Sequence, residues 1–306
     1  MFFMSENLAE VFLKKTDSRE DGVKDLLENF DMDEFTNKNI ALKANYNSAD
    51  PFPASTHPET LKLLVNTLKK YGANKIVMAE RSGMGNTRHV LEKMGIFKLA
   101  DEEDFELVVL DEEGADSWKK IKKEGNHWIK GFYISKIFTE AEKVVQTCCL
   151  KAHRFGGHFT LSIKNSVGLV AKKVPGHKYN YMGELHLSPY QRYMIAEINQ
   201  QYPTDLVLMD GMKAFVNNGP ERGRVVEPNL MLASKDRVAI DAVGVAVLRH
   251  YGTTREVSRG KIFELEQIKR AAELDVGVKR AENIVITGLD PESEAVAGEL
   301  EEILLE

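Results

Sequence analysis

Residues 144–158 read VVQTCCLKAHRFGGH, and this stretch near the midpoint of the 306-residue chain decides the fold prediction. Its first half is apolar enough for a buried strand. Its second half is a loop rich in glycine, histidine and cationic side chains. Open α/β sheets present their ligand sites where an apolar strand ends in such a loop. The stretch therefore predicts both a central strand and the position of a functional site.

Other apolar segments are also predicted to be short strands, and helical patterns follow several of them. They are residues 39–46, 75–79, 106–110, 206–209, 230–233 and 283–288. Strands that alternate with helices favour a parallel sheet with helices on its faces. We therefore expect an α/β fold with a mainly parallel open sheet flanked by helices. Residues 1–306 would form one domain, either uninterrupted or with a small inserted subdomain.

Three local features follow from the same patterns. The strand at residues 206–209 is expected to end in a loop at Asp210 and Gly211. A helix that begins near residue 58 is expected to use Ser55 or Thr56 as its cap, with His57 as the alternative. Residues 171–190 have no regular periodicity. Because long irregular loops inside compact domains are usually functional, this segment is predicted to be a lid.

The composition is that of a globular protein without a strongly basic surface. A formal net charge of −6 argues against broad nucleic-acid binding, which normally leaves a basic footprint. No apolar run approaches the roughly 20 residues that cross a bilayer. Residues 1–10 lack the apolar core of a signal peptide. We expect a cytoplasmic protein with neither a nucleic-acid nor a membrane partner, and the oligomeric state stays open.

The chain contains two cysteines, Cys148 and Cys149, and they are adjacent. Neighbouring residues of a strand point to opposite faces, so these two thiols are not expected to bridge. Buried thiols are the preferred interpretation, and a reactive or ligating pair is the alternative. A four-cysteine iron–sulfur site cannot be built from this chain alone.

The central loop gathers cationic side chains that suit a carboxylate or phosphate. These candidates are Lys151, His153, Arg154, His158 and Lys164. Backbone N–H groups of Gly156 and Gly157 would complete the cradle, and Asn165 and Asn218 would add polar contacts. In the alternative, structural interpretation, the same cations pair with Asp210, Asp241 or Glu80.

A second glycine loop follows the strand at residues 75–79. Its candidate binding residues are Ser82, Gly83 and Gly85, and a helix follows it. The order strand, glycine loop, helix suits an anion. The loop matches neither a Walker motif nor a dinucleotide fingerprint. A ligand loop and a structural turn are equally compatible with this pattern.

Two kinds of chemistry are open to the central loop. In the first, His153 or His158 transfers protons, Asp210 orients the imidazole, and Lys164 stabilises negative charge or acts as a base. In the second, a divalent transition metal is held by histidines, for which the candidates are His153, His158, His177 and His186. The helical Glu/His and clustered Cys/His patterns of zinc sites are absent from the sequence.

The chain resembles the family called domain of unknown function 362 over about residues 38–290. The central motifs are Leu150-Lys151-Ala152-His153, Gly157, Lys164-Asn165 and Gly168-Leu169. The later motifs are Asp205-Leu206, Met209-Asp210-Gly211, Asn218-Gly219-Pro220, Gly223, Ala233-Ser234-Lys235-Asp236 and Ala239-Ile240-Asp241-Ala242-Val243. Many members carry an iron–sulfur label. The ferredoxin segment with repeated Cys-x-x-Cys motifs, common in that family, is absent here, so the label is not transferred.

A second similarity is to the amino-terminal part of the nickel-pincer lactate racemase family. Residues 153–157 precede Lys164, and a Val174-Pro175-Gly176-His177 segment follows. In that family the lysine anchors the cofactor, and histidines bind nickel or move protons. The spacing here differs by one residue, and the Gly-Gly-Arg/Phe-Lys context of the lysine is missing.

These observations together predict an α/β enzyme that binds a small anionic substrate at residues 151–165. Catalysis would use His/Lys acid–base chemistry or a metal. The alternative is a non-catalytic protein that handles a metal or acts as a redox partner of an iron–sulfur protein.

Overall fold

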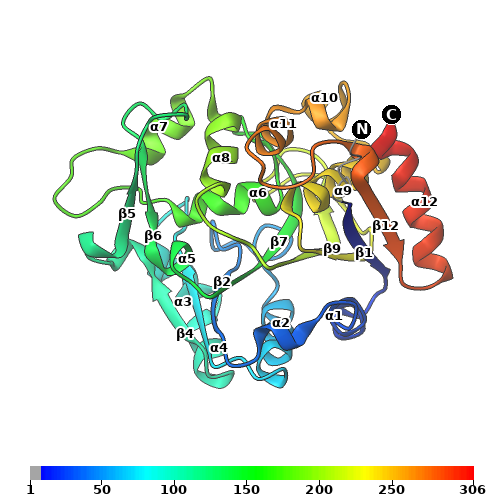
Figure 1. The fold of residues 1–306 in the computed structure, drawn as a ribbon, viewed down its shortest axis with the longest axis horizontal. Helices are drawn as coiled ribbons and strands as arrows, with labels where there is room; N and C mark the ends of the chain where they lie inside the picture. Colours follow the sequence, from blue (N-terminus) through cyan, green and yellow to red (C-terminus); the bar gives the residue numbers. More distant parts are fainter. Residues whose placement is uncertain (1–7) are drawn as a thin grey trace, which may run out of the picture.

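Most strands of the computed structural model, which describes residues 8–306, belong to one open sheet (Figure 1). The strand order is β12-β1-β11-β9-β7-β2-β3-β4, with β8 paired to β7 and β10 paired to β9. The ten strands are β1 (Ala9–Lys15), β2 (Asn39–Lys43), β3 (Lys75–Glu80), β4 (Glu106–Val109), β7 (Lys143–His153), β8 (His158–Thr160), β9 (Leu206–Phe215), β10 (Val225–Val226), β11 (Leu230–Ser234) and β12 (Ile284–Gly288). A separate antiparallel pair consists of β5 (Trp118–Ile121) and β6 (Phe132–Ser135).

The strand directions confirm the predicted α/β class. The neighbours β4, β3, β2, β7 and β9 all run parallel, and β12 runs parallel to β1. Strand β11 lies antiparallel between β1 and β9. The chain reaches β11 from β9 through residues 216–229 without a helix, which suits antiparallel neighbours. The sheet is therefore mixed but mostly parallel.

Helices cover both faces of the sheet (Figure 1). One core lies beneath α1 (Arg19–Leu27), α2 (Pro58–Lys70), α3 (Thr87–Lys93) and α4 (Ile96–Glu102). The other lies beneath α8 (Gln191–Asn199), α9 (Arg237–His250), α11 (Glu266–Glu273) and α12 (Pro291–Leu305). The shorter helices are α5 (Lys136–Thr139), α6 (Ser162–Asn165), α7 (Tyr181–Leu187) and α10 (Arg255–Ser258).

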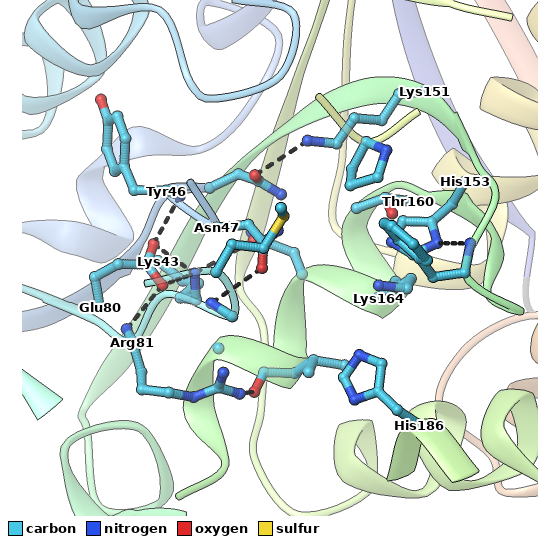
Figure 2. A pocket seen from close by; sticks show the side chains of 18 residues that line it. Lys43, Tyr46, Asn47, Glu80, Arg81, Lys151, His153, Thr160, Lys164 and His186 are labelled. Carbon is cyan, nitrogen blue, oxygen red and sulfur yellow. Dashed lines mark hydrogen bonds and ion pairs between the residues drawn. The ribbon is translucent and has the colours of Figure 1, made fainter. Parts of the chain in front are cut away.

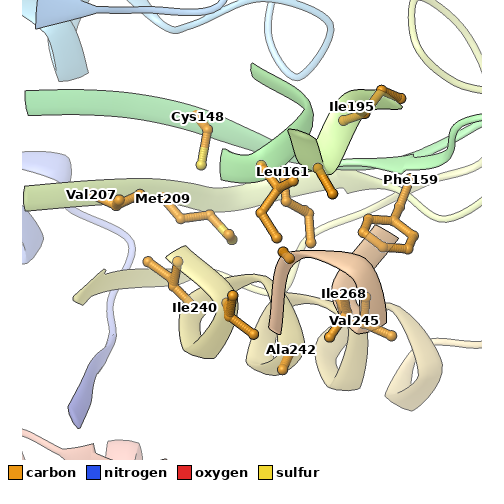
Figure 3. Packing of buried hydrophobic residues seen from close by; sticks show 14 of the residues in the cluster. Cys148, Phe159, Leu161, Ile195, Val207, Met209, Ile240, Ala242, Val245 and Ile268 are labelled. Atoms are coloured by element: carbon orange, nitrogen blue, oxygen red, sulfur yellow. The ribbon is translucent and has the colours of Figure 1, made fainter. Parts of the chain in front are cut away.

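The central helix α9 packs closely against β7 and β9 (Figure 3). A Cβ atom at Gly244 would lie 2.9 Å from Leu161 and 3.2 Å from Met209, so a larger residue would push the helix away. Strand β7 is buried on both faces: Cys148 packs in the core beneath α9, and Cys149 is also fully buried. Burial raises the pKa of the Cys149 thiol to about 11 and that of Cys148 well above its usual value. Both cysteines are free, as the preferred interpretation expected.

One local prediction is wrong, and for a second the alternative is confirmed. Strand β9 continues through Asp210 and Gly211 to Phe215, because a register shift against β7 lets the ladder resume at Ala214. Helix α2 is capped by His57, whose Nδ1 accepts a hydrogen bond from the Glu59 N–H at 3.2 Å. The favoured caps are used elsewhere: the Ser55 hydroxyl donates to the Ser48 carbonyl, and the Thr56 hydroxyl accepts from the Asn45 N–H.

The predicted lid segment is partly helical. Residues 181–187 form α7, which begins where the Asn180 side chain accepts from the Gly183 N–H. The irregular part, residues 171–180, is fastened by Lys172, whose ammonium group donates to the Gly85 carbonyl and to Asp111, both at 3.1 Å. Movement of this segment as a lid stays a prediction.

Across residues 8–306, no helix has both the length and the apolar character required to cross a membrane. Residues 1–7, which the signal-peptide expectation includes, lie outside the described part of the chain.

Candidate active site

A cavity of about 260 Å³ lies at the carboxyl ends of β2, β3 and β7 (Figure 2). From β2 the chain builds outward to β3 and β4, and then returns to place β7 on the other side of β2. The boundary between β2 and β7 is therefore a topological switch point, where open α/β sheets bind ligands. The predicted convergence of strand-end loops is confirmed.

Six predicted site residues line this cavity. They are Gly83, Lys151, His153, Lys164, Asn165 and His186. The hairpin of β7 and β8 brings several of them together, because its register pairs Lys151 with Thr160 and His153 with His158. Paired residues of antiparallel strands project to the same face. The buried Thr160 side chain accordingly lines the cavity beside Lys151.

Other predicted residues lie outside the cavity lining. The half-buried His158 has its pKa lowered by burial and by nearby Arg192. Arg154 pairs with Glu221, at 3.0 Å from Nη1 to Oε2, and donates to the carbonyl of Asn218 at 2.6 Å. The structural interpretation therefore holds for Arg154, but its partner is none of the three carboxylates that we expected.

Asp210 does not orient a cavity histidine, contrary to expectation. Its Oδ2 atom accepts hydrogen bonds from Arg19 Nε at 2.9 Å and from Thr60 Oγ1 at 2.6 Å, and its Oδ1 accepts from the Met212 N–H. The carboxylate joins α1, α2 and β9 on the sheet face opposite α9. Its buried position arises because β9 continues past residue 209.

The glycines mainly provide room for neighbouring side chains. A Cβ atom at Gly157 would lie 2.5 Å from Lys164 Cε, and one at Gly156 would lie 2.5 Å from Gln191 Oε1. In the second glycine loop, Gly85 offers its carbonyl to Lys172. The Ser82 hydroxyl donates to the Tyr46 carbonyl at 2.6 Å. Of this loop's three predicted residues, Gly83 is the one that lines the cavity.

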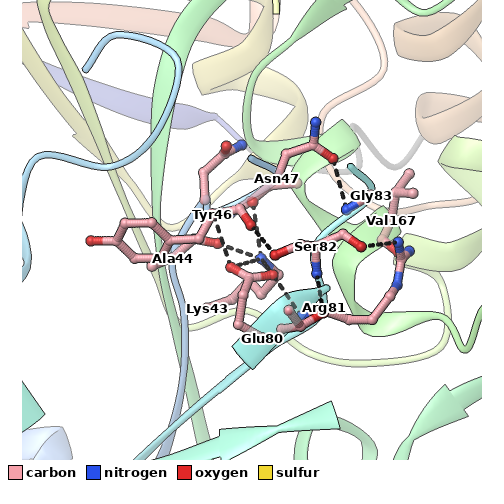
Figure 4. A network of polar contacts seen from close by, with 12 residues as sticks. Lys43, Ala44, Tyr46, Asn47, Glu80, Arg81, Ser82, Gly83 and Val167 are labelled. Carbon is pink, nitrogen blue, oxygen red and sulfur yellow. Dashed lines mark hydrogen bonds and ion pairs between the residues drawn. The ribbon is translucent and has the colours of Figure 1, made fainter. Parts of the chain in front are cut away.

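A buried ion pair that the sequence analysis missed supports one wall of the cavity (Figure 4). Lys43 Nζ lies 2.7 Å from each carboxylate oxygen of Glu80 and also donates to the Ala44 carbonyl. Glu80 accepts two backbone hydrogen bonds besides, from the N–H groups of Tyr46 and Arg81. Burial lowers the pKa of Lys43. The signal in the sequence was a charged residue at the end of each of two apolar strands, Lys43 in β2 and Glu80 in β3.

Arg81 extends this wall toward the lid segment. Its Nε donates to the Val170 carbonyl at 2.9 Å, and Nη2 contacts the Val167 carbonyl and Met182 Sδ. Arg81 is 2% exposed, and its guanidinium group donates to backbone carbonyls rather than to a carboxylate. Burial lowers its pKa.

Lys151 and Lys164 approach the cavity from its other side. The Lys151 ammonium group donates to Asn45 Oδ1 at 3.3 Å and to the Ala54 carbonyl. Within residues 8–306, no hydrogen bond or ion pair is recorded for the Lys164 amine. Burial, with the charges of Lys151 and Arg81, lowers the pKa of Lys164 to about 7. The Lys164 amine can therefore gain or lose its proton near neutral pH.

Two imidazoles complete the site. Burial and the Lys164 charge hold the pKa of His153 well below its ordinary value, and burial lowers that of His186. His153 Nδ1 accepts from the Phe155 N–H at 3.2 Å, which places the proton of the neutral ring on Nε2. His186 Nδ1 lies 2.7 Å from the Met182 carbonyl and must donate, which leaves Nε2 as an acceptor. The two rings therefore have complementary tautomers.

The predicted four-histidine metal set is not assembled. His153 and His186 share the cavity, whereas the His177 ring packs against Tyr133 at a centroid distance of 5.4 Å. No three His, Cys, Asp or Glu side chains among the described residues lie close enough together to hold a metal ion. A metal- or cluster-handling role stays a prediction without a ligand set in this part of the chain.

The chain is similar to two known proteins that are longer than it is. It is 27% identical over 201 residues to a thylakoid-associated protein of Synechocystis sp., a match that covers 63% of this chain and 57% of that protein. The lactate racemase apoprotein of Thermoanaerobacterium thermosaccharolyticum aligns with 70% of this chain and 53% of its own, at 22% identity and a TM-score of 0.44. The chain therefore spans somewhat more than half the length of each.

The family model described as domain of unknown function (DUF362) matches residues 40–246. This match covers more than half of the chain and includes the cavity-lining residues of β2, β3 and β7. The resemblance expected from the sequence motifs is confirmed, and the chain belongs to the DUF362 family.

Proposed function

We propose that this DUF362 protein is an enzyme that binds a small carboxylate- or phosphate-bearing substrate in the cavity at the ends of β2, β3 and β7. The observation that carries the proposal is the charge of the lining. Lys43, Arg81, Lys151 and Lys164 line the cavity with one carboxylate, Glu80, which is already paired with Lys43. Buried cations without a carboxylate partner are costly, so an anionic ligand would be stabilised there.

The lining divides into groups suited to binding and groups suited to proton transfer. Lys151 and the Thr160 hydroxyl, which has no recorded partner, are placed to bind the anion. Lys164, with a pKa of about 7, suits proton transfer near neutral pH. Ligand pockets usually have volumes of about 300–1,000 Å³. The cavity volume of about 260 Å³ lies just below this range, which favours a compact substrate.

Thermal unfolding with added acetate or inorganic phosphate tests the proposal. A ligand at about 100 times its dissociation constant stabilises the folded protein by about 2.7 kcal/mol, which raises the melting temperature measurably. Lys151→Met should abolish the shift. Lys213→Met, at an exposed lysine paired with Glu227, should retain it. Absence of any shift in the unaltered protein, or an equal shift in Lys151→Met, would refute the proposed anion site.

A further inference from the structure

The three lysines of the cavity differ in what their amines contact. Lys43 is fixed as a cation, because both carboxylate oxygens of Glu80 lie 2.7 Å from its Nζ. Lys151 is held as a hydrogen-bond donor by Asn45 and the Ala54 carbonyl. The Lys164 amine lines the cavity with no recorded partner in residues 8–306 (Figure 2). This amine is therefore available to a ligand.

The surroundings of Lys164 favour the unprotonated amine, which is the nucleophilic form. The positive charges of Lys151 and Arg81 act on it, and the carboxylate of Glu80 is already engaged by Lys43. Its aliphatic chain passes directly over Gly157, where a Cβ atom would lie 2.5 Å from Cε. Desolvation and a neighbouring cation are the two means by which proteins activate a lysine as a nucleophile.

We propose that Lys164 forms an imine with the carbonyl group of a small 2-oxo acid whose carboxylate is held by Lys151 and Thr160. This assignment rests on the proposed anion site and names the substrate class for it. A 2-oxo acid places its carbonyl carbon next to its carboxylate. The β7–β8 register pairs Lys151 with Thr160, and Thr160 precedes Lys164 by four residues. The two anion-binding side chains and the amine therefore line one cavity.

The step balances with groups already in the site. The lone pair of Lys164 Nζ forms a bond to the carbonyl carbon, and the carbonyl oxygen takes up a proton to give a carbinolamine. The nitrogen then loses a proton, the carbon–oxygen bond breaks, and the oxygen leaves as water when it gains a second proton. Both protons of the departing water come from the Lys164 nitrogen, which leaves a neutral imine. The His186 Nε2 acceptor relays them to the oxygen, and the His153 Nε2–H group donates a hydrogen bond to that oxygen.

Reductive trapping tests this inference. The protein is incubated with pyruvate and sodium cyanoborohydride, and peptide mass mapping locates the stable secondary amine. We expect one adduct at Lys164, with exposed Lys213 as the internal reference for non-specific reaction. Lys164→Arg keeps a positive charge but cannot form the imine, so it should lose the adduct while acetate still protects it from thermal unfolding. Lys151→Met keeps the nucleophile and should reduce the yield at Lys164.

The outcomes separate this inference from the proposed anion site. An adduct at Lys164 well above that at Lys213, with a yield that rises as pH increases through about 7, supports the imine. Protection by acetate without an adduct from pyruvate overturns the imine and leaves the anion site standing. Failure of both protection and trapping overturns both. Equal labelling of Lys164 and Lys213 also overturns the imine, because it would show no activation.

Discussion

Replacing Lys164 with methionine is expected to stabilise the protein at neutral and acidic pH, although it removes a polar contact to any ligand. The structure lowers the pKa of Lys164 from 10.5 to about 7. Below pH 7 the folded protein must accommodate an ammonium ion in an electropositive cavity, whereas the unfolded chain solvates it in water. Between pH 7 and 10.5 the unfolded chain binds more proton than the folded protein, so the stability of the unaltered protein rises with pH in that window.

The size of this effect follows from the pKa difference. Each unit corresponds to about 1.4 kcal/mol, so the change from 10.5 to about 7 sets an upper limit of about 5 kcal/mol. The Lys164 side chain is only half-buried, and solvent screening reduces the expected gain for Lys164→Met to about 2–3 kcal/mol below pH 7. Methionine has nearly the same length without the charge. Above the unfolded pKa, the two proteins should differ little.

Urea unfolding at about pH 6, 8 and 10 measures the difference directly. The advantage of Lys164→Met should be largest at the lowest pH and should shrink as pH rises. Lys213→Met is the matched control, because an exposed ion pair contributes only about 0–1 kcal/mol and should give no such trend. A difference that is constant across this range, or a Lys164→Met protein that is less stable at every pH, would refute the proposed cost of the Lys164 charge in the folded protein.

Two further substitutions test the cavity walls. In Gly157→Ala, the new Cβ atom should displace the flexible end of the Lys164 side chain, at a cost of about 1 kcal/mol in stability. Unchanged pyruvate trapping at Lys164 would contradict this packing. Glu80→Gln should destabilise the protein by about 3–5 kcal/mol in urea unfolding, because it leaves the Lys43 ammonium group buried without its counter-charge. Combining Glu80→Gln with Lys43→Met should recover part of that loss, and a simple sum of the two single effects would show that the pair is not coupled.

The central site could be predicted because its signal is local. An apolar strand, a glycine pair and nearby cations lie within residues 144–165, and the β7–β8 hairpin keeps them together in space. Lys43 and Glu80 could not be paired from the sequence, because their contact depends on β2 and β3 being neighbours in the sheet. The prediction that Asp210 orients a cavity histidine was wrong for a related reason. Whether β9 ends at residue 209 or continues depends on its pairing with β7 and β11, and the sequence of β9 alone does not specify that pairing.

The motif at residues 233–243 illustrates how distant segments contribute to one site. Asp241 on α9 was considered as a partner for the central cations, but its carboxylate accepts from the backbone N–H groups of Ser162 and Ile163 at 2.8 and 3.0 Å. Those residues begin α6, the short helix that carries Lys164 and Asn165. Asp241 therefore fixes the backbone immediately before Lys164, because a fully buried carboxylate keeps its stability only while these donors stay in place. Through Asp241, the motif on α9 holds the start of α6 in place and so positions Lys164 at the cavity. Two segments that are distant in the sequence thereby contribute to one site.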